Sequence, residues 1–304
     1  MIGIVIVNYC TWEATKECVA SIKDNCEMPY RVYIVDNDSP NDSMMQLRAF
    51  YANDETVKLF SSGKNGGYGY GLNCGIRAAI ADGCDAIIAS NNDIIYLEGA
   101  IETMYDCLTS SPQIGCAGAA QRTESGGEMY SAQFAPDTAL SMALRYIPLR
   151  GKLELRRYAR RVRGGGNLPV FCPMGGCYML RAEAIQAAGF FDESVFMYCE
   201  ENILGFRLRK AGYTARLCTE ARVIHEKGKT TGNSKTRQKI KSVESILRYG
   251  KQYLGWRAIH RTVFANLLRL NLFLSGKYDE EAKRELNAAL EAGKRQGGED
   301  KCAC

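Results

Sequence analysis

An alternation of short apolar runs with helix-like segments in the first third of the chain constrains the fold most strongly. Residues 2–7 form an almost continuous apolar run, as expected of a strand buried on both faces of a sheet. A helix is expected over residues 11–25, and further strand-like runs cover residues 31–35, 57–60 and 86–89. Strands that alternate with helices predict an α/β fold with a mostly parallel sheet.

Polar or glycine-rich clusters follow the second, third and fourth of these runs. The second run leads into a turn that begins at Asp36, the third into residues 64–75, and the fourth into Asn-Asn-Asp at residues 91–93. Because the carboxyl ends of parallel strands meet at one edge of a sheet, the loops that carry these clusters are expected to converge there. The sequence therefore predicts a ligand site at this edge.

The rest of the chain predicts further strands, further helices and a helical end. Helices are expected at residues 98–110, 182–188 and 200–211, and strands at residues 115–119, 170–181 and 221–224. A polar, glycine-bearing loop is expected after His225, followed by helices and a polar tail. We therefore expect three regions, at residues 1–93, 94–232 and 233–304.

Composition and cysteine usage narrow the class of protein. A chain of 304 residues with 46% hydrophobic content can bury a sizeable core, and its formal net charge of +5 is modest. The 13 cysteines include no CxxC pair, and with only two histidines the chain lacks the ligand set of a zinc finger. The N-terminal residues carry no basic leader, so we expect a cytoplasmic, reducing compartment and mostly free thiols.

No apolar run approaches the roughly 20 residues needed to span a bilayer, but two segments predict peripheral contact with an anionic membrane. Residues 145–163 carry eight basic residues against one carboxylate, Glu154, and residues 263–274 are largely apolar. Anionic lipid attracts such basic segments, which would hold the protein on the inner face of the plasma membrane. Alternatively, the basic segment is a solvated loop and the apolar helix completes the core. Nucleic acid is not expected, because the basic segment lacks regular aromatic interleaving.

Two carboxylates at strand ends are candidates for binding a nucleotide. Asp93 follows the fourth strand beside two asparagines, which suits Mg²⁺ or Mn²⁺ that keeps phosphate oxygens as its other ligands. Asp36 follows the second strand, where it could accept a hydrogen bond from the ring N–H of uracil or thymine. The alternatives are a polar turn at residues 91–93 and an Asx turn at Asp36.

Three further segments could carry binding or catalysis. The glycine-rich residues 65–71 match neither a P-loop nor a GxGxxG fingerprint, and their expected role is close backbone approach to a nucleotide ahead of a helix near Asn73. Glu200 and Glu201 follow an apolar stretch at a helix start, where a partly desolvated carboxylate can act as a base or simply cap the helix. His225 could ligate the metal, donate to a departing phosphate, or be structural.

Taken in order, seven segments between residues 2 and 232 resemble the family-2 glycosyltransferases of GT-A fold, and in particular their rhamnosyltransferase-like branch. They are IVIVNY, VDNDSPNDS, NGGYGYGLNCGI, NND, GGCYMLRAEAIQAAGFFDESVFMYCEEN, FRLRKAGY and VIHEKGKTTG. The resemblance implies a GT-A-like (Rossmann-like) mixed, mostly parallel sheet flanked by helices, with a C-terminal helical extension. It also implies a nucleotide-sugar-binding half to residue 93 and an acceptor-binding, catalytic half to residue 232.

The resemblance implies roles for individual residues. Glu201 matches the catalytic base, Asp36 a contact to the nucleotide base, and Asp93 and His225 the metal site. The substrate-binding residues are expected to be Asn8, Tyr9, Asp36, Asn65, Gly67, Asn73, Asn91, Asn92, Glu200, His225 and Lys229. The chain departs from the family pattern in having one carboxylate in the turn at residues 91–93, Glu in place of Asp at residue 201, and Ile203 where an acid is common.

The expected reaction is inverting, metal-dependent transfer of a sugar from a nucleotide diphosphate to a hydroxyl of a glycan or lipid-linked glycan in cell-surface polysaccharide synthesis. The first choice of donor is dTDP-rhamnose, and a UDP-hexose is the alternative. Arginines of residues 145–163 could bind the diphosphate of a lipid-linked acceptor.

Two other functions stay open. A nucleotidyltransferase is expected to carry a basic, glycine-rich loop after its first strand, where this chain has NYCTW at residues 8–12. A non-catalytic sugar-nucleotide-binding scaffold would not release nucleotide in the presence of an acceptor.

Overall fold

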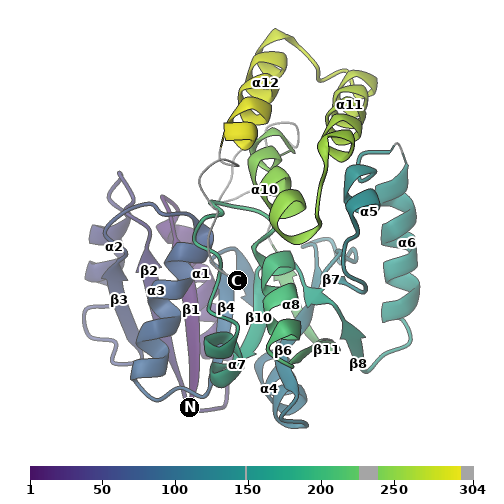
Figure 1. Cartoon of the computed structure of the whole chain (residues 1–304). Coiled ribbons are helices and arrows are strands. Elements are labelled where there is room, and N and C mark those ends of the chain that lie inside the picture. The colour runs from purple at the N-terminus through teal and green to yellow at the C-terminus, as the bar shows by residue number, and fades with distance from the viewer. Residues whose placement is uncertain (148, 226–238, 296–304) are drawn as a thin grey trace.

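The structure is a computed structural model that describes residues 1–147, 149–225 and 239–295. Its described strands form a nine-stranded sheet in the order β3-β2-β1-β4-β10-β6-β11-β5, with β8 paired to β11 (Figure 1). The strands are β1 (Ile2–Asn8), β2 (Tyr30–Asp36), β3 (Val57–Ser61), β4 (Ala86–Asn91), β5 (Ile94–Tyr96), β6 (Ile114–Arg122), β8 (Asn167–Val170), β10 (Cys177–Arg181) and β11 (Thr214–His225).

The sheet is mixed, as the sequence predicts. Strands β3, β2, β1 and β4 are parallel to one another, whereas β10 is antiparallel to both of its neighbours, β4 and β6. Strand β11 is parallel to β6 but antiparallel to β5 and β8. A small second sheet joins β7 (Ala132–Gln133) to β9 (Cys172–Pro173).

Alternating residues of β1 face two separate cores, which explains its unbroken apolar sequence. Ile4 and Ile6 pack in the first core, on the side of α1 (Trp12–Asn25) and α4 (Ala100–Thr109). Val5 and Val7 pack in the second core, on the side of helices that cover the other face. These are α3 (Tyr68–Ala81), α7 (Ala182–Ala187) and α8 (Glu200–Lys210). Helix α2 (Ser43–Phe50) lies between β2 and β3 in the chain.

The expected C-terminal helices are present and build a third core. They are α10 (Val243–Tyr253), α11 (Ala258–Leu274) and α12 (Glu280–Arg295). Their apolar residues pack with Met142 of α5 (Ala139–Ala143) and Ile203 of α8. Figure 1 shows these helices standing at one end of the sheet, with α6 (Arg150–Val162) at the outer side. Region boundaries at residues 93 and 232 stay a prediction.

The glycine-rich segment is helical from Tyr68 on, which corrects the expectation of a helix starting near Asn73. Helix α3 begins at Tyr68, and its glycines allow it to lie close to the sheet. A Cβ on Gly71 would lie 2.9 Å from a Val7 methyl carbon, and one on Gly75 would lie 2.3 Å from a Val5 methyl carbon. These glycines therefore serve helix–sheet packing, a requirement that the local sequence does not reveal.

The basic segment also has regular structure, since most of it forms helix α6. Helix α11 buries Phe264, Leu268 and Leu272 in the third core, as expected if it completes the core. None of the helices within the described ranges combines the length and apolar character that crossing a bilayer requires. The cysteines in these ranges are free thiols and most are buried, as expected.

Candidate active site

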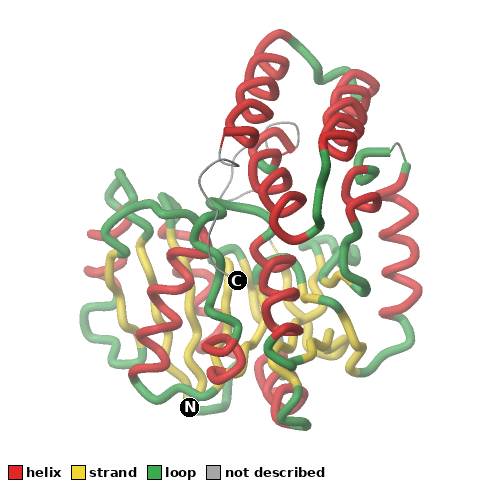
Figure 2. The backbone as a smooth tube through the Cα atoms, viewed as in Figure 1, coloured by secondary structure: helices red, strands yellow, loops and turns green. Residues whose placement is uncertain are grey.

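Loops gather at the end of the sheet that faces the C-terminal helices, at the carboxyl ends of β1, β2 and β4 (Figure 2). Asn8 and Asp36 end β1 and β2 as paired residues in the ladder, and Asn8 Nδ2 donates to Asp36 Oδ2 at 2.7 Å. Ser39 donates its backbone N–H and its hydroxyl to the same carboxylate, at 2.9 and 2.8 Å. Asp36 therefore closes a turn, and because a carboxylate has about four acceptor positions, one remains for a ligand.

A chain of hydrogen bonds extends from Asn8 to the turn after β4. The Thr15 hydroxyl donates to Asn8 Oδ1 at 2.8 Å, and Asn92 Nδ2 lies 3.0 Å from the Thr15 hydroxyl and 2.8 Å from that of Thr11. Asn8 and Asn92, which the sequence predicts in one site, are thus joined through α1, while Tyr9 is 40% exposed beside them. The sequence reading missed both threonines, because nothing local shows that α1 lies between the two turns.

The Gly67 loop contacts the segment before α8 rather than open space. Gly67 has φ 94°, and a Cβ there would lie 2.2 Å from the Phe196 carbonyl oxygen. The backbone N–H of Tyr68 donates to that same oxygen at 2.9 Å. The side-chain oxygen of Asn65 accepts hydrogen bonds from Asn37 Nδ2 and the backbone N–H of Gly67, at 3.1 and 3.3 Å, and so shapes the loop.

Asn73 lies inside α3 and supports a different loop. Its side chain is fully buried, donates to the Phe191 carbonyl and to Glu193, and accepts from the Phe191 N–H. These contacts favour a structural role, and the expected ligand contacts of Asn65, Gly67 and Asn73 stay predictions.

Asp93 and His225 come together because β5 and β11 pair directly after the turn at residues 91–93. His225 Nε2 lies 3.2 Å from Asp93 Oδ1, and both side chains are buried. On the other side of the ring, His225 Nδ1 lies 2.9 Å from Gln121 Oε1, whose amide nitrogen donates to the Met174 carbonyl at 2.6 Å. This anchoring fixes the orientation of the ring, with Nε2 on the side of Asp93.

The Asp93–His225 pair meets some requirements of a metal site but not all of them. Asp93 Oδ1 is buried and receives no hydrogen bond, so a hard cation could use it. Within the described ranges no group of three His, Cys, Asp or Glu side chains is arranged to hold a metal. The pair still fits Mg²⁺ or Mn²⁺ in one respect, since such ions commonly take one or two protein ligands and complete their shell with phosphate oxygens and water.

Two consecutive glycines lie between the Asp93–His225 pair and the carboxylates of α8. Gly175 and Gly176 have φ of 90° and 77°, and a Cβ on Gly176 would lie 2.2 Å from Asn91 Oδ1. A Cβ on Gly175 would lie 2.5 Å from Gln121 Oε1. The Gly175 N–H donates to Glu201 Oε1 at 3.2 Å. The backbone here thus runs between both halves of the site, which only glycine permits.

Glu200 and Glu201 begin α8 after two residues with positive φ, Tyr198 at 70° and Cys199 at 66°. Both carboxylates are buried, which disfavours their charged forms. The helix N-terminus has the opposite effect, because it favours negative charge. Burial, and then the neighbouring charge of Glu201, raise the pKa of Glu200 well above its usual value. Two buried carboxylates side by side disfavour ionisation of both at once.

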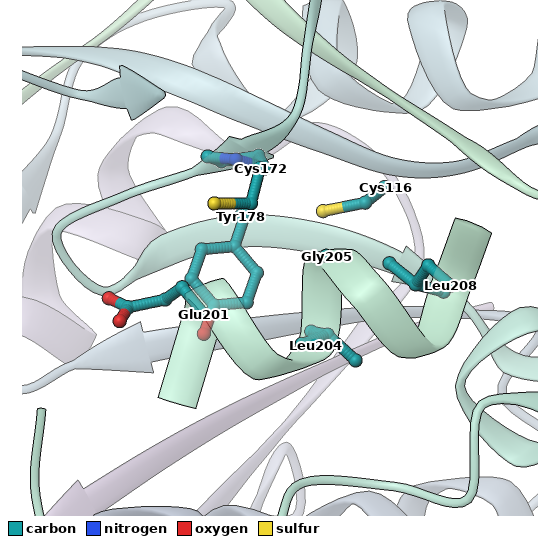
Figure 3. Close-up of a pocket in the computed structure, with 8 residues that line it drawn as sticks. Cys116, Cys172, Tyr178, Glu201, Leu204, Gly205 and Leu208 are labelled. Atoms are coloured by element: carbon teal, nitrogen blue, oxygen red, sulfur yellow. The ribbon is translucent and has the colours of Figure 1, made fainter. Parts of the chain in front are cut away.

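Figure 3 shows Glu201 beside Tyr178, among the residues that line a small cavity next to α8. The lining residues are Cys116, Cys172, Pro173, Tyr178, Glu201, Leu204, Gly205 and Leu208. The cavity measures about 10 Å³, which is near the lower limit for one water molecule. It is therefore too small for a sugar or a nucleotide.

The structure thus joins several of the expected site residues in two networks. Asn8, Asp36 and Asn92 share one network, and Glu201 reaches His225 through Gly175 and Gln121. Lys229 lies outside the described residues. Gln121 was missed, although a polar residue at the carboxyl end of the parallel strand β6 is a signal that could have identified it.

Comparisons with known proteins agree with this geometry. A family model described as Glycosyl transferase family 2 matches residues 3–188, and one described as Glycosyl transferase family group 2 matches residues 158–276. An N-acetylglucosaminyl-diphospho-decaprenol L-rhamnosyltransferase of Mycobacterium tuberculosis is 28% identical over 243 residues, which cover 76% of this chain and 78% of that protein.

Solved structures share the fold. The mannosyltransferase PcManGT from Pyrobaculum calidifontis, in complex with GDP-Man and Mn²⁺, has a TM-score of 0.59 at 11% identity over 99% of this chain and 88% of that one. TarS 1-349 from S. aureus, in complex with UDP-GlcNAc, has a TM-score of 0.58 at 13% identity over 96% and 80% of the two chains. The GT-A-like α/β fold expected from the sequence is confirmed.

Proposed function

This chain belongs to glycosyl transferase family 2, and on that basis we propose that it transfers a sugar, with inversion, from a nucleoside diphosphate to a hydroxyl acceptor. The buried carboxylate of Glu201 is the observation that carries the proposal. It is linked through Gly175 and Gln121 to the Asp93–His225 pair, so a base and a diphosphate-binding pair share one site.

Glu201 acts as the general base in this proposal. Its Oε1 accepts the Gly175 N–H, which orients the carboxylate, while the other oxygen takes the proton of the acceptor hydroxyl. The acceptor oxygen attacks the anomeric carbon as the bond to the diphosphate breaks, which inverts that carbon. Glu200, whose pKa is raised by burial and by the charge of Glu201, lies beside it in the sequence and is proposed to contact substrate.

Asp93 and His225 would hold Mg²⁺ or Mn²⁺ through Oδ1 and Nε2. When bound, such an ion neutralises charge that develops on the departing nucleoside diphosphate. A divalent cation is supported by the Mn²⁺ that accompanies GDP-Man in the complex of the Pyrobaculum calidifontis mannosyltransferase. Lys229, outside the described residues, is proposed to assist at the diphosphate.

The donor is proposed to be dTDP-rhamnose, with a UDP-hexose as the alternative, because the mycobacterial relative is named as an L-rhamnosyltransferase. Asn8, Tyr9 and Asp36 are proposed to contact its nucleoside, and Asn91 and Asn92 its ribose. The remaining acceptor position on Asp36 supports a contact to the ring N–H of thymine or uracil. The relative's name also supports an acceptor glycan carried on a lipid diphosphate.

Transfer from the donor is tested by measuring nucleoside diphosphate release with and without acceptor, in the presence of Mn²⁺. Glu201→Gln should reduce transfer by about 10²-fold or more, because an amide cannot take the proton. The comparison variant is Glu200→Gln, which removes the neighbouring buried carboxyl but not the proposed base and should reduce transfer less than Glu201→Gln does. An inactive Glu200→Gln beside an active Glu201→Gln would reverse the assignment. Donor binding without any release by the wild type would identify a non-catalytic scaffold.

We propose in addition that the outer face of α6 contacts an anionic membrane surface that carries the acceptor. Helix α6 buries only Tyr158, whose ring packs 5.2 Å from that of Tyr130. Five exposed cations of the helix and its C-terminal end form no ion pair with any described residue: Lys152, Arg156, Arg157, Arg160 and Arg163. Leu153, 49% exposed, and Leu155, 40% exposed, lie among them, and Leu149, 74% exposed, directly precedes the helix. Basic residues interleaved with exposed leucines are typical of helices that lie in a membrane interface.

Liposome flotation tests this surface with vesicles of phosphatidylcholine alone or mixed with phosphatidylglycerol. Changing three α6 cations should abolish salt-sensitive flotation, because each basic residue near an anionic surface contributes about 1 kcal/mol. The test variant carries Arg156→Gln, Arg157→Gln and Arg160→Gln. The charge-matched control carries Arg48→Gln, Lys210→Gln and Lys277→Gln, at exposed positions elsewhere. Equal flotation of both variants, or none with anionic vesicles, would exclude α6 as the membrane surface.

A further inference from the structure

We propose that the hydroxyl groups of Tyr68 and Tyr178 hydrogen-bond the transferring sugar and position it between the diphosphate and the base. This inference rests on the proposed function, because it assumes that a nucleotide sugar is the ligand. Neither tyrosine is among the residues that the sequence indicated, although Tyr68 lies in the glycine-rich segment and Tyr178 directly follows Gly175-Gly176-Cys177.

Unpartnered polar atoms gather around these two tyrosines. Within the described ranges, the buried side-chain atoms that lack a hydrogen bond include the hydroxyls of Tyr68 and Tyr178 and Glu200 Oε2. Buried polar groups are normally hydrogen-bonded, since an unmet donor or acceptor retains its full desolvation cost. Three such atoms near Glu201 indicate that a polar ligand completes their hydrogen bonding, because the cavity beside Glu201 has room for one water at most.

The two tyrosines reach this site from rigid and separate elements. Tyr68 opens α3, and its N–H is held by the Phe196 carbonyl at 2.9 Å. Tyr178 is in β10, in the middle of the sheet, where it pairs with Ala89 on one side and Gly118 on the other. The backbone of both residues is therefore fixed by contacts that involve neither hydroxyl.

The charges that act on the two hydroxyls agree with a location beside the carboxylates of the site. Burial, and then the charges of Glu201, Glu200 and Asp93, raise the pKa of Tyr68 well above 10.0. Burial raises the pKa of Tyr178 in the same direction, and Glu201 is the largest charge acting on it. The Tyr68 hydroxyl is thus near both the metal-side carboxylate and the α8 carboxylates, while the Tyr178 ring stands beside Glu201 (Figure 3). Both hydroxyls keep their protons and can donate.

The reaction geometry assigns this location to the sugar. In a single displacement the anomeric carbon lies between the departing diphosphate oxygen and the attacking acceptor oxygen. The first oxygen is proposed to lie at Asp93 and His225, and the second at Glu201. A side chain that lies between these two oxygens must therefore contact the transferring sugar. Sugar hydroxyls donate and accept hydrogen bonds, as does a tyrosine hydroxyl, so each tyrosine can satisfy one sugar hydroxyl.

The test removes only the hydroxyls, with the variants Tyr68→Phe and Tyr178→Phe. The matched control is Tyr158→Phe, which alters a buried tyrosine in the packing of α6. For each protein, the dissociation constants of dTDP-rhamnose and of dTDP are measured with Mn²⁺ by titration calorimetry, and UDP-glucose with UDP serves as the second ligand pair. Melting temperature without ligand is recorded as the readout of a purely structural role.

We expect Tyr68→Phe and Tyr178→Phe to weaken binding of the nucleotide sugar at least 10-fold while binding of the free nucleoside diphosphate stays unchanged. The melting temperature without ligand should stay the same or rise, because an unpartnered buried hydroxyl is removed. Tyr158→Phe should leave both dissociation constants unchanged.

Three outcomes decide against the inference. A lower melting temperature with unchanged sugar-nucleotide affinity would show that the hydroxyls are structural. Equally weaker binding of the nucleotide sugar and of the nucleoside diphosphate would show that the hydroxyls contact the nucleotide and not the sugar. If the wild type binds neither nucleotide sugar more tightly than its nucleoside diphosphate, no sugar contact exists for the tyrosines to make. If the wild type binds none of the four ligands, the proposed function itself is wrong. This result differs from the three outcomes above, which reject only the tyrosine contacts.

Discussion

Replacing Gly67 by alanine tests whether α3 and the segment before α8 meet as closely as the structure describes. Gly67 has φ 94° and ψ 176°, a backbone region that only glycine adopts readily, so alanine costs about 1–3 kcal/mol there. Its Cβ would also lie 2.2 Å from the Phe196 carbonyl oxygen. Because that atom is backbone, the two segments must separate and break the hydrogen bond from the Tyr68 N–H, worth about 0.5–1.5 kcal/mol.

We therefore expect Gly67→Ala to lower the free energy of unfolding by about 2–4 kcal/mol, a large share of the 5–15 kcal/mol typical of a domain. Urea unfolding measures this as a lower midpoint with an unchanged slope. The matched control is Gly83→Ala, which also has positive φ (82°) but whose Cβ would meet no atom within 4 Å. It should lose only about 1–2 kcal/mol, the cost of the left-handed conformation.

Equal losses in the two variants would refute the close contact with Phe196. Activity provides a second readout, measured at a temperature at which both variants are folded. Gly67→Ala should reduce transfer more than Gly83→Ala does, because Phe196 belongs to the segment that leads into Glu200 and Glu201.

Two further predictions concern the carboxylates of the site. Asp93→Ala should abolish the Mn²⁺-dependent part of the thermal stabilisation by a nucleotide sugar. The control Asp24→Ala, at an exposed position, should retain that stabilisation. An unchanged effect of Mn²⁺ in Asp93→Ala would reject the metal site. Because the folded state raises the pKa of Glu200, its ionisation opposes folding increasingly as the pH rises above about 4.5. Glu200→Gln should therefore raise the melting temperature more at pH 8 than at pH 5, and a pH-independent difference would contradict the buried, charge-coupled environment.

Much of the fold could be predicted because its signals are local. The apolar run of β1, the stop of α8 before Gly212 and the polar turns after β2 and β4 depend on neighbouring residues, and the structure has them where expected. The start of α3 could not be predicted in this way. Glycines at residues 69, 71 and 75 lower helix propensity, but packing of α3 against Val5 and Val7 outweighs that cost.

The candidate site was predictable in its residue types and less so in its contacts. A carboxylate after a strand, a histidine at the end of another and two glutamates at a helix start are visible in sequence order. Which of them meet depends on strand pairing: β5 beside β11 brings Asp93 to His225. Likewise, Gly175 reaches Glu201 only because the turn before β10 passes α8.

The sequence by itself determined the alternation of strands and helices, the edge of the sheet at which polar loops collect, and the residue types available there, because these follow from short-range patterns and chain direction. Only the tertiary structure decided that Gln121 orients His225, that Thr15 joins Asn8 to Asn92, and that the hydroxyls of Tyr68 and Tyr178 lie buried near Glu201 without a hydrogen-bond partner. Each of these contacts joins residues from different elements. Their formation depends on how the sheet and helices pack as a whole, which no local pattern encodes.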